Sequence, residues 1–328
     1  MHPHLLPAHR RTVMKLVALS LVAGAGAVVR AQDKFPSRPI RITVPFPVGT
    51  TDYVGRLIGQ RLGEQLGATI VVENKTGASG NIAADFVANA PADGYNLLLG
   101  AVSVVTNPAL MGKPAYVPSQ LVPLGVGIDS HLVLLARLDF PARDLTGLVK
   151  AAADRPGAVN AASPGVATLP HLGVEMLATQ AHVKFNHVPY RGSALALTDI
   201  LAGRVDWVID SLASAKAFLS SGKVRALAVL TPKRVPSLPD VATAGEQGFQ
   251  FLEFSAWNGF MVAAGTSSTM VQTLHEALAR AIQAPETSKA LMERDLDPVV
   301  MSPGAYLEFM QRESKRWSQV IKDANVTV

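Results

Sequence analysis

Short apolar runs alternate with amphipathic segments along most of the chain. The run at 40–44 is followed by a turn and by apolar side chains at helical spacing, which stop at Gly67. The apolar runs at 70–73, 97–99, 159–162, 187–188, 207–209 and 226–230 are each followed by a polar or glycine turn and, in most cases, by a predicted helix. Strands that alternate with helices at this spacing predict an α/β fold, with parallel sheets covered on both faces. In such sheets, ligands bind beyond the carboxyl ends of the strands.

The pattern changes near the C-terminus, where strand signals are few after 257–262. Ser268 is the predicted cap of one helix, and Pro303 is predicted to start another. We expect both helices to pack back on a lobe built earlier in the chain.

The first 31 residues read as a secretory signal peptide. Basic residues precede an apolar run at 16–29, and Val29 and Ala31 place small residues at the positions that a signal peptidase reads, so cleavage is expected near Ala31. The run is shorter than the roughly 20 residues that span a bilayer. The start codon is either Met1 or Met14, and Arg10–Arg11 leaves general secretion and twin-arginine export both open. Either route predicts a periplasmic protein.

Composition narrows the classes of function. At 328 residues, with 48% hydrophobic and 17% charged residues, the chain is long enough for two lobes around a sizeable core. Residues 1–31 hold four of the 30 basic residues and none of the 25 acidic ones, so the remainder has a net charge of +1. A nucleic-acid partner is therefore not expected. The lack of cysteine excludes disulfides, thiol catalysis and a lipid-modified cysteine.

Three polar turns follow predicted strands and precede predicted helices. They lie at 49–52, 163–168 and 190–193. A helix N-terminus presents unpaired N–H groups that favour a carboxylate or a phosphate. Alternatively, Thr51 or Asp52 simply caps its own helix, as Thr168 and Ser193 are expected to do in the later turns. Asp210, at the end of an apolar run, is expected either to hydrogen-bond a ligand or to fix the turn that follows.

Signatures of enzymes and cofactors are weak. Ser163, His171 and Asp210 could be imagined as a triad, but the serine lacks the G-x-S-x-G elbow and precedes a proline. The histidines after the signal show no metal-ligand spacing, and the glycines at 77–80 match no nucleotide-binding motif. We therefore predict no catalytic residue, no metal and no cofactor.

Several segments, in order, resemble one family of receptors. They are FPSRPIRITVPFP, VVENKTGASGNIAADFVANAPADGY, NPAL, HVPYRGSALALTDILAGRVD, VRALAV and LPDVAT, and they span the chain from about Phe35 to the C-terminus. This sequence resembles the solute receptors of the tripartite tricarboxylate transporter family, the TctC or Bug-type proteins. The resemblance implies a type II periplasmic binding protein, a two-lobe Venus flytrap with a ligand cleft between the lobes. Lobe 1 is expected at 34–129 plus 253–328, and lobe 2 at 130–252.

The resemblance also implies which residues bind the ligand. Carried onto this sequence, the ligand-binding set is Phe46, Pro47, Val48, Gly49, Thr50, Asp52, Ala101, Val102, Ser103, Ser163, Gly165, Thr168, Tyr190, Gly192 and Asp210.

Three departures from the family pattern put its usual ligand in doubt. The first turn is one residue shorter and lacks a glycine, Ala167 replaces a glycine, and valines occupy much of a normally polar segment at 101–107. The valines predict a ligand with an apolar or aromatic portion, unless they face the core.

Three functions stay open. The chain is expected to be a monomeric receptor that delivers a small carboxylate or related metabolite to a membrane permease. Alternatively, it is an orphan receptor that signals to a membrane sensor, or an exported enzyme. Binding without turnover would separate the receptors from the enzyme.

Overall fold

A computed structural model describes residues 35–111 and 115–327. The predicted signal peptide at 1–31 lies outside the described residues. The fold below is that of residues 38–327, which belong to one compact unit. Within the described residues, no helix is long and apolar enough to cross a membrane.

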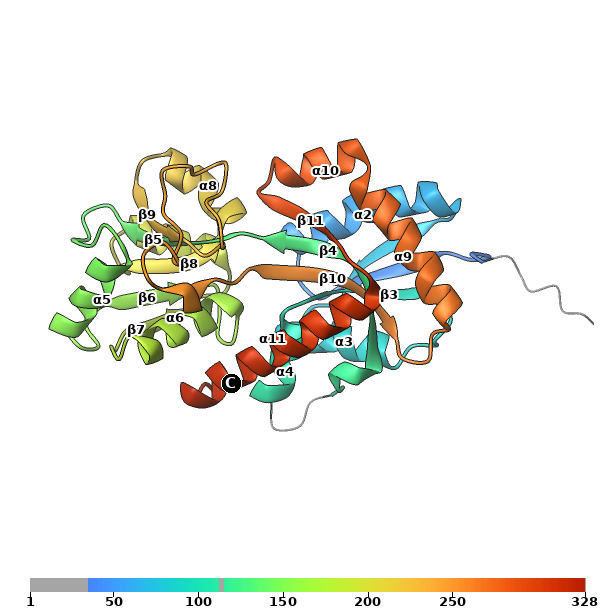
Figure 1. Ribbon diagram of the computed structural model, residues 1–328, viewed down its shortest axis with the longest axis horizontal. Coiled ribbons are helices and arrows are strands. Elements are labelled where there is room, and N and C mark those ends of the chain that lie inside the picture. The colour runs from blue at the N-terminus through green and yellow to red at the C-terminus, as the bar shows by residue number, and fades with distance from the viewer. Residues whose placement is uncertain (1–34, 112–114, 328) are drawn as a thin grey trace, which may run out of the picture. The chain divides into compact units, whose positions relative to one another are not determined.

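The first lobe is built on a six-stranded sheet with the order β11-β4-β10-β3-β1-β2 (Figure 1). Its strands are β1 (Ile40–Val44), β2 (Ile70–Asn74), β3 (Asn96–Ala101), β4 (Leu121–Ser130), β10 (Ala256–Ala263) and β11 (Leu296–Val300). Its helices are α2 (Thr50–Leu66), α3 (Asn81–Ala88), α4 (Ser103–Leu110), α9 (Ser268–Gln283), α10 (Pro285–Met292) and α11 (Pro303–Asp323).

The second lobe is built on a five-stranded sheet with the order β7-β6-β8-β5-β9. Its strands are β5 (Leu132–Arg137), β6 (Asn160–Ser163), β7 (Asn186–Pro189), β8 (Trp207–Ser211) and β9 (Val224–Val229). Its helices are α5 (Leu145–Asp154), α6 (Leu169–Gln180), α7 (Ser193–Leu201) and α8 (Leu212–Ser220). The α/β two-lobe fold predicted from the sequence is confirmed.

The prediction of parallel sheets is only partly right. Strands β2, β1 and β3 run parallel, as do β7, β6 and β8. In contrast, β10 and β11 pair antiparallel with β4, and β5 pairs antiparallel with β8 and β9. The antiparallel pairs arise where the chain changes lobe, because β4 leads directly through His131 into β5 of the other sheet.

Two segments join the lobes, His131 between β4 and β5 and the stretch that leads into β10 (Figure 1). Helix α11 packs on β4 and α4 and also contacts α6 of the second lobe. The lobe boundaries at 129/130 and 252/253 stay a prediction.

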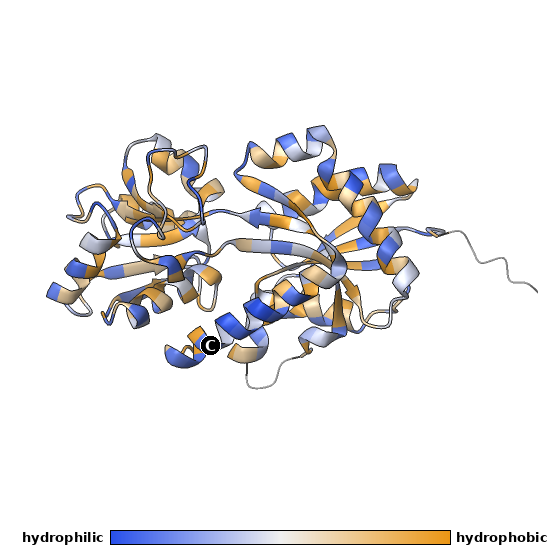
Figure 2. Ribbon diagram, viewed as in Figure 1, coloured by the Kyte–Doolittle hydropathy of each residue, from blue (hydrophilic) through white to orange (hydrophobic). Residues whose placement is uncertain are grey.

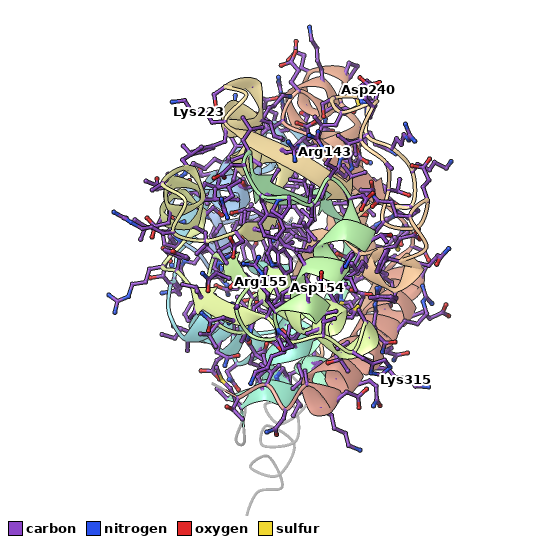
Figure 3. The ribbon with its side chains drawn as sticks, turned by 90° about the vertical axis from the view of Figure 1, so that its left-hand side faces the viewer. Arg143, Asp154, Arg155, Lys223, Asp240 and Lys315 are labelled. Atoms are coloured by element: carbon purple, nitrogen blue, oxygen red, sulfur yellow. The ribbon has the colours of Figure 1, made fainter. Side chains whose placement is uncertain are left out.

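Apolar side chains fill both sheets, as the sequence pattern requires. Strand β1 has Ile40, Ile42 and Val44 fully buried, and Figure 2 shows apolar residues along the strands and polar residues on the outer helix surfaces. Figure 3 shows Lys223, Asp240 and Lys315, all exposed, at the periphery of the molecule as seen in that view.

A buried carboxylate links α11 to the sheet. Glu313 accepts hydrogen bonds from the indole nitrogens of Trp257 on β10, at 3.3 Å, and of Trp317 on α11, at 2.9 Å. These bonds satisfy polar groups that would otherwise destabilise the core.

The two C-terminal helices predicted from the sequence are present. Pro303 begins α11 as expected, and the preceding Ser302 caps it. The cap of α9 is Ser267 rather than Ser268, because the Ser267 hydroxyl accepts from the N–H of Met270. Strand β11, between these helices, was not predicted.

Candidate functional site

A network of hydrogen-bonded side chains holds the turn between β1 and α2 in place. Asp52, 4% exposed, forms an ion pair of 2.9 Å with Arg56. The Asn74 side chain donates to Asp52 and to the carbonyl of Phe46, both at 2.9 Å. The hydrogen bond from Arg56 is the main cause of the lowered pKa of Asp52. Asp52 therefore stays ionised and holds the turn in place.

Asp52 and Thr51 do not cap α2. Gly49 occupies the N-cap position, and no side chain accepts from the first turn. The alternative in which one of these residues caps its own helix is therefore wrong.

Helices α4 and α6 also begin without a side-chain cap. Thr168 lies at the predicted N-cap position of α6, but its hydroxyl donates to the carbonyl of Gly165 at 2.7 Å. By contrast, α5, α8, α9 and α11 are each capped by the side chain of an aspartate or a serine. Capping side chains are thus missing at the start of α2, α4 and α6, as they are in α3, α7 and α10.

The N-termini of α2, α4 and α6 meet at a cavity of about 360 Å³ between the lobes, which we call the cleft. Thr51, Ser103 and Thr168 bring the three helices to its wall, and β10 contributes Trp257 and Asn258. None of the described residues that line the cleft is charged. The cleft therefore presents backbone N–H groups and hydroxyls, rather than a cationic side chain, to a ligand.

Much of the cleft wall is apolar. Phe46, Val102, Leu169 and Trp257 line it, together with small side chains such as Ala101 and Ala256. Pockets of this kind combine an apolar lining with a few polar groups that orient the ligand.

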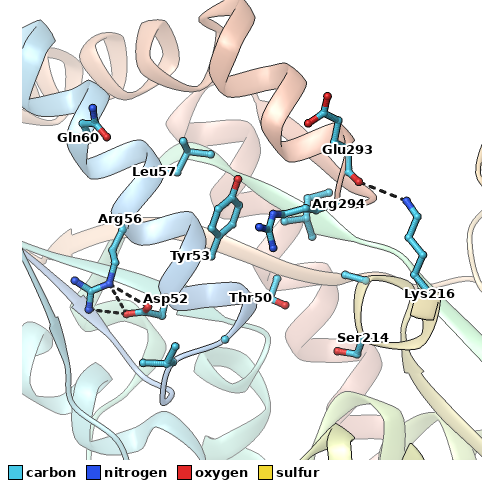
Figure 4. Close-up of a pocket in the computed structure, with 14 residues that line it drawn as sticks. Thr50, Asp52, Tyr53, Arg56, Leu57, Gln60, Ser214, Lys216, Glu293 and Arg294 are labelled. Atoms are coloured by element: carbon cyan, nitrogen blue, oxygen red, sulfur yellow. Dashed lines mark hydrogen bonds and ion pairs between the residues drawn. The ribbon is translucent and has the colours of Figure 1, made fainter. Parts of the chain in front are cut away.

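A second cavity of about 710 Å³ lies on the other side of the first turn. It is lined by residues of α2, including Thr50, Tyr53 and Arg56, and by Lys216 of α8 (Figure 4). The guanidinium of Arg294 lies over the ring of Tyr53, 4.0 Å from its centroid. Its charged side chains are already paired or exposed, so this cavity is a less specific site than the cleft.

Comparison with known proteins places the chain in a family. Residues 54–326 match the family described as "Tripartite tricarboxylate transporter family receptor". The chain belongs to this receptor family.

Relatives of the receptor match it over nearly their whole length. BugT of Bordetella pertussis is 33% identical over 305 residues, which cover 92% of this chain and 93% of BugT. The "UPF0065 protein in tcbD-tcbE intergenic region" of a Pseudomonas species is 35% identical and covers 97% of this chain and 96% of its own.

Solved structures of related receptors carry small dicarboxylates. Rpa4515 of R. palustris, described with adipate, is 33% identical with a TM-score of 0.80, covering 89% of this chain and 99% of its own. MatC from Rhodopseudomonas palustris, described with bound malate, is 31% identical with a TM-score of 0.76, covering 88% and 100%. The receptor is thus a solute-binding protein by family and by fold.

The predicted ligand-binding residues fall into three groups. Those that line the cleft are Phe46, Ala101, Val102, Ser103, Gly165 and Thr168. Those that line the second cavity are Val48, Gly49, Thr50 and Asp52. Pro47, Ser163, Tyr190, Gly192 and Asp210 line neither cavity. Their roles in ligand binding stay predictions.

Several residues of the third group have partners inside the protein. The Tyr190 hydroxyl donates to Asp199 at 2.8 Å. Asp210 accepts from the Ser193 hydroxyl and the N–H of Ser211, both at 2.7 Å. Ser193 is therefore the first residue of α7 and not its cap, because its hydroxyl is bound to Asp210.

Sequence reasoning missed the contribution of β10. Asn258 is 6% exposed, and its amide donates to the Thr51 hydroxyl and to the carbonyl of Gly100, at 3.5 and 3.4 Å. A lone amide in an otherwise apolar strand was the available signal, since such a side chain requires partners.

Proposed function

We propose that the receptor binds a small carboxylate in the cleft and delivers it to a membrane permease of the tripartite tricarboxylate type. The observation that carries this proposal is the convergence of three uncapped helix N-termini on a cavity without charged lining residues. Helix N-termini stabilise an anion through oriented N–H groups and partial positive charge. The carboxylates in the related structures support this choice of ligand class.

The apolar wall favours a ligand with an alkyl or aromatic portion. Of the valines that motivated this prediction, Val102 lines the cleft, whereas Val104 and Val105 are buried and do not. Phe46, which was predicted to bind the ligand, also lines the cleft, and Leu169 and Trp257 add apolar surface that the sequence did not indicate. A fully polar tricarboxylate would leave this surface without a partner and would itself lose solvation.

The experiment is a calorimetric titration of the mature protein with adipate, malate, benzoate and citrate. We expect adipate or benzoate to bind at least about tenfold more tightly than citrate, because burying two CH₂ groups alone stabilises by about 1.6 kcal/mol. Tighter binding of citrate than of every other acid would contradict the proposed ligand class. Chemical change of any bound acid would point instead to an exported enzyme.

Two variants test how the carboxylate is held. The Ser103 hydroxyl lies at the cleft wall, whereas Arg191 is exposed and lines neither cavity. Ser103→Ala should weaken binding about fivefold to tenfold, as expected for one lost hydrogen bond to an anion. Arg191→Ala should leave affinity within about twofold, because exposed charges are screened. If Arg191→Ala abolished binding and Ser103→Ala did not weaken it, the charge of Arg191, and not the helix N-termini, would hold the carboxylate.

Export and delivery complete the proposal. A signal peptide at 1–31, cleaved near Ala31, would place the receptor in the periplasm. The mass of the protein recovered from a periplasmic extract tests this, with Gln32 as the expected first residue. Co-purification of the receptor with a permease would support transport, whereas co-purification with a sensor protein would support signalling.

A further inference from the structure

Two stacked histidines lie behind the turn at 163–168, outside the cleft. His171 is on α6 and His187 is on β7, with ring centroids 4.0 Å apart and an interplanar angle of 11°. His171 is only 6% exposed. Neither histidine lines the cleft, although the turn in front of them does.

The two rings hold both ends of this turn. The N–H of Ala167 donates to Nδ1 of His171 at 2.9 Å. Nε2 of His187 lies 2.8 Å from the hydroxyl of Ser163. Ser163 is fully buried, and its hydroxyl donates to the carbonyl of Gly165. Both contacts of this hydroxyl are therefore with the turn and its support and not with the cleft.

Ala167 adopts a conformation that its side chain disfavours. Its φ is +59°, in the left-handed region where a non-glycine residue is destabilised by roughly 1–2 kcal/mol. Ala167 also lines the cleft. The bond to His171 therefore stabilises a strained residue at the ligand-facing surface.

The hydrogen bonds define the state of the rings. Because Nδ1 of His171 accepts from a backbone N–H, the proton of the neutral ring is on Nε2, which lies 3.5 Å from Glu175. Burial, and then the neighbouring His171, lowers the pKa of His187 to about 4, so this ring is neutral near pH 7. Two uncharged rings can stack without repulsion.

A metal site is the alternative for these residues, since ligand atoms of His171, Glu175 and His187 lie within 4.8 Å of one another. A metal on Nε2 of His171 would require the proton on Nδ1, where it would oppose the N–H of Ala167. The lone pairs of two nearly parallel rings also cannot converge on one ion at about 2.0–2.1 Å. The geometry therefore favours support of the turn over metal binding.

We propose that His171 and His187 are positioning residues of the cleft, whose neutral, stacked rings hold the 163–168 turn in the shape that receives the ligand. This inference rests on the proposed function for its ligand, but not for the geometry of the turn. Ligand-free measurements therefore test it separately.

The first test compares His171→Leu, which removes the acceptor, with His171→Asn, whose Oδ1 takes the place of Nδ1. His182→Asn, at an exposed position in the turn that follows the same helix, is the control. The measurement is hydrogen exchange of the Ala167 amide by NMR, without ligand. We expect exchange about tenfold faster in His171→Leu and within about threefold of wild type in the other two variants, as for one lost hydrogen bond. Unchanged exchange in His171→Leu would overturn the proposal.

Nitrogen NMR of the wild-type imidazoles keeps the proposal falsifiable if His171→Leu does not fold. We expect the Nε2–H tautomer at His171, and the Nδ1–H tautomer would overturn the proposal. Zinc binding to the wild type that is lost in His171→Asn would also overturn it, in favour of a metal site.

The second test is titration of the same variants with adipate. Binding should weaken about tenfold in His171→Leu and recover in His171→Asn. Equal affinity in wild type and His171→Leu would overturn the proposal. If the wild type binds none of adipate, malate, benzoate and citrate, the proposed ligand class fails, while the exchange and tautomer measurements still decide this inference.

Discussion

Asp210 shows how one buried carboxyl group can link stability to pH. It lies at the end of β8, is 1% exposed, and has one oxygen, Oδ2, without a hydrogen-bond partner among the described residues. Burial raises its pKa to about 6, and the bonds from Ser193 and Ser211 only partly offset this effect. The group thus binds a proton more readily in the folded protein than in the unfolded chain.

Asp210→Asn should change the pH dependence of stability. Because the folded pKa is above that of an unfolded aspartate, the protonated group contributes stability below about pH 4, and this contribution is lost as pH rises through 6. Relative to wild type, Asp210→Asn should therefore gain up to about 3 kcal/mol between pH 4 and pH 7. Urea unfolding of both proteins at several pH values measures the difference, and a constant difference across this range would contradict the raised pKa.

At the scale of elements, two glycines allow close contacts, one between strands β4 and β10 and one between β10 and α11. A Cβ on Gly127 of β4 would lie 2.0 Å from the carbonyl oxygen of Asn258. A Cβ on Gly259 of β10 would lie 2.1 Å from the hydroxyl of Tyr306, which is itself buried. Gly127 therefore lets β4 pair closely with β10, and Gly259 lets β10 pack against Tyr306 of α11.

Gly127→Ala should destabilise the protein by about 1–3 kcal/mol or more, because the obstacle is backbone that cannot move without breaking the strand pairing. The matched control is Gly304→Ala in the first turn of α11, where a Cβ meets nothing within 4 Å. The control should be neutral or slightly stabilising, since alanine is the better helix former. Thermal unfolding compares the two variants. Equal melting temperatures would contradict the prediction, because they would mean that β4 and β10 accommodate the added Cβ without loss of stability.

At the scale of the whole folded unit, a polar contact joins the two lobes away from the cleft. Lys216 of α8 lies 3.0 Å from Asp295, just before β11, and donates to the carbonyl of Glu293 at 3.4 Å (Figure 4). Ser237, which follows β9, donates to the other oxygen of Asp295 at 2.5 Å. The contact joins both lobes in this conformation, so it can bias the balance between open and closed forms.

Lys216→Met should shift this balance toward the open form. Lys216 is about half exposed, with 48% of its side chain accessible, so we expect an effect of only about 1 kcal/mol, or roughly fivefold weaker adipate binding. Small-angle scattering should show compaction of the wild type on adding adipate, and a larger ligand-free radius in the variant. Lys233→Met, which changes an exposed lysine on the same lobe, is the control. Identical scattering of the wild type without ligand and at saturating ligand would contradict closure by the lobes.

The sequence by itself determined most of the strands that are followed by a turn and a helix, although β5, which precedes α5, was not predicted. Ile40–Val44 and Trp207–Ser211 are apolar runs with clear turns behind them, and their burial against helices follows from that local pattern. It also indicated two of the polar turns that reach the cleft, at 49–52 and 163–168, because turn chemistry is local, whereas Tyr190 and Gly192 of the third turn line neither cavity.

Only the tertiary structure decided which strands cross between lobes. Strand β4 was missed because Pro123, Gly125 and Gly127 interrupt its apolar run, and the strand is stable only through its pairing with β10 and β11. Strand β11 was missed for a similar reason, since Pro298 is tolerated there at the edge of the sheet.

The tertiary structure also decided what each polar side chain does. The hydroxyls of Thr168 and Ser193 have the chemistry of caps, but nearby groups bind them instead. His171 and His187 are 16 residues apart and stack only because α6 packs against β6 and β7. A sequence pattern determines local geometry and burial. The hydrogen-bond partner of a polar side chain depends instead on which groups the complete fold brings within about 3 Å of it.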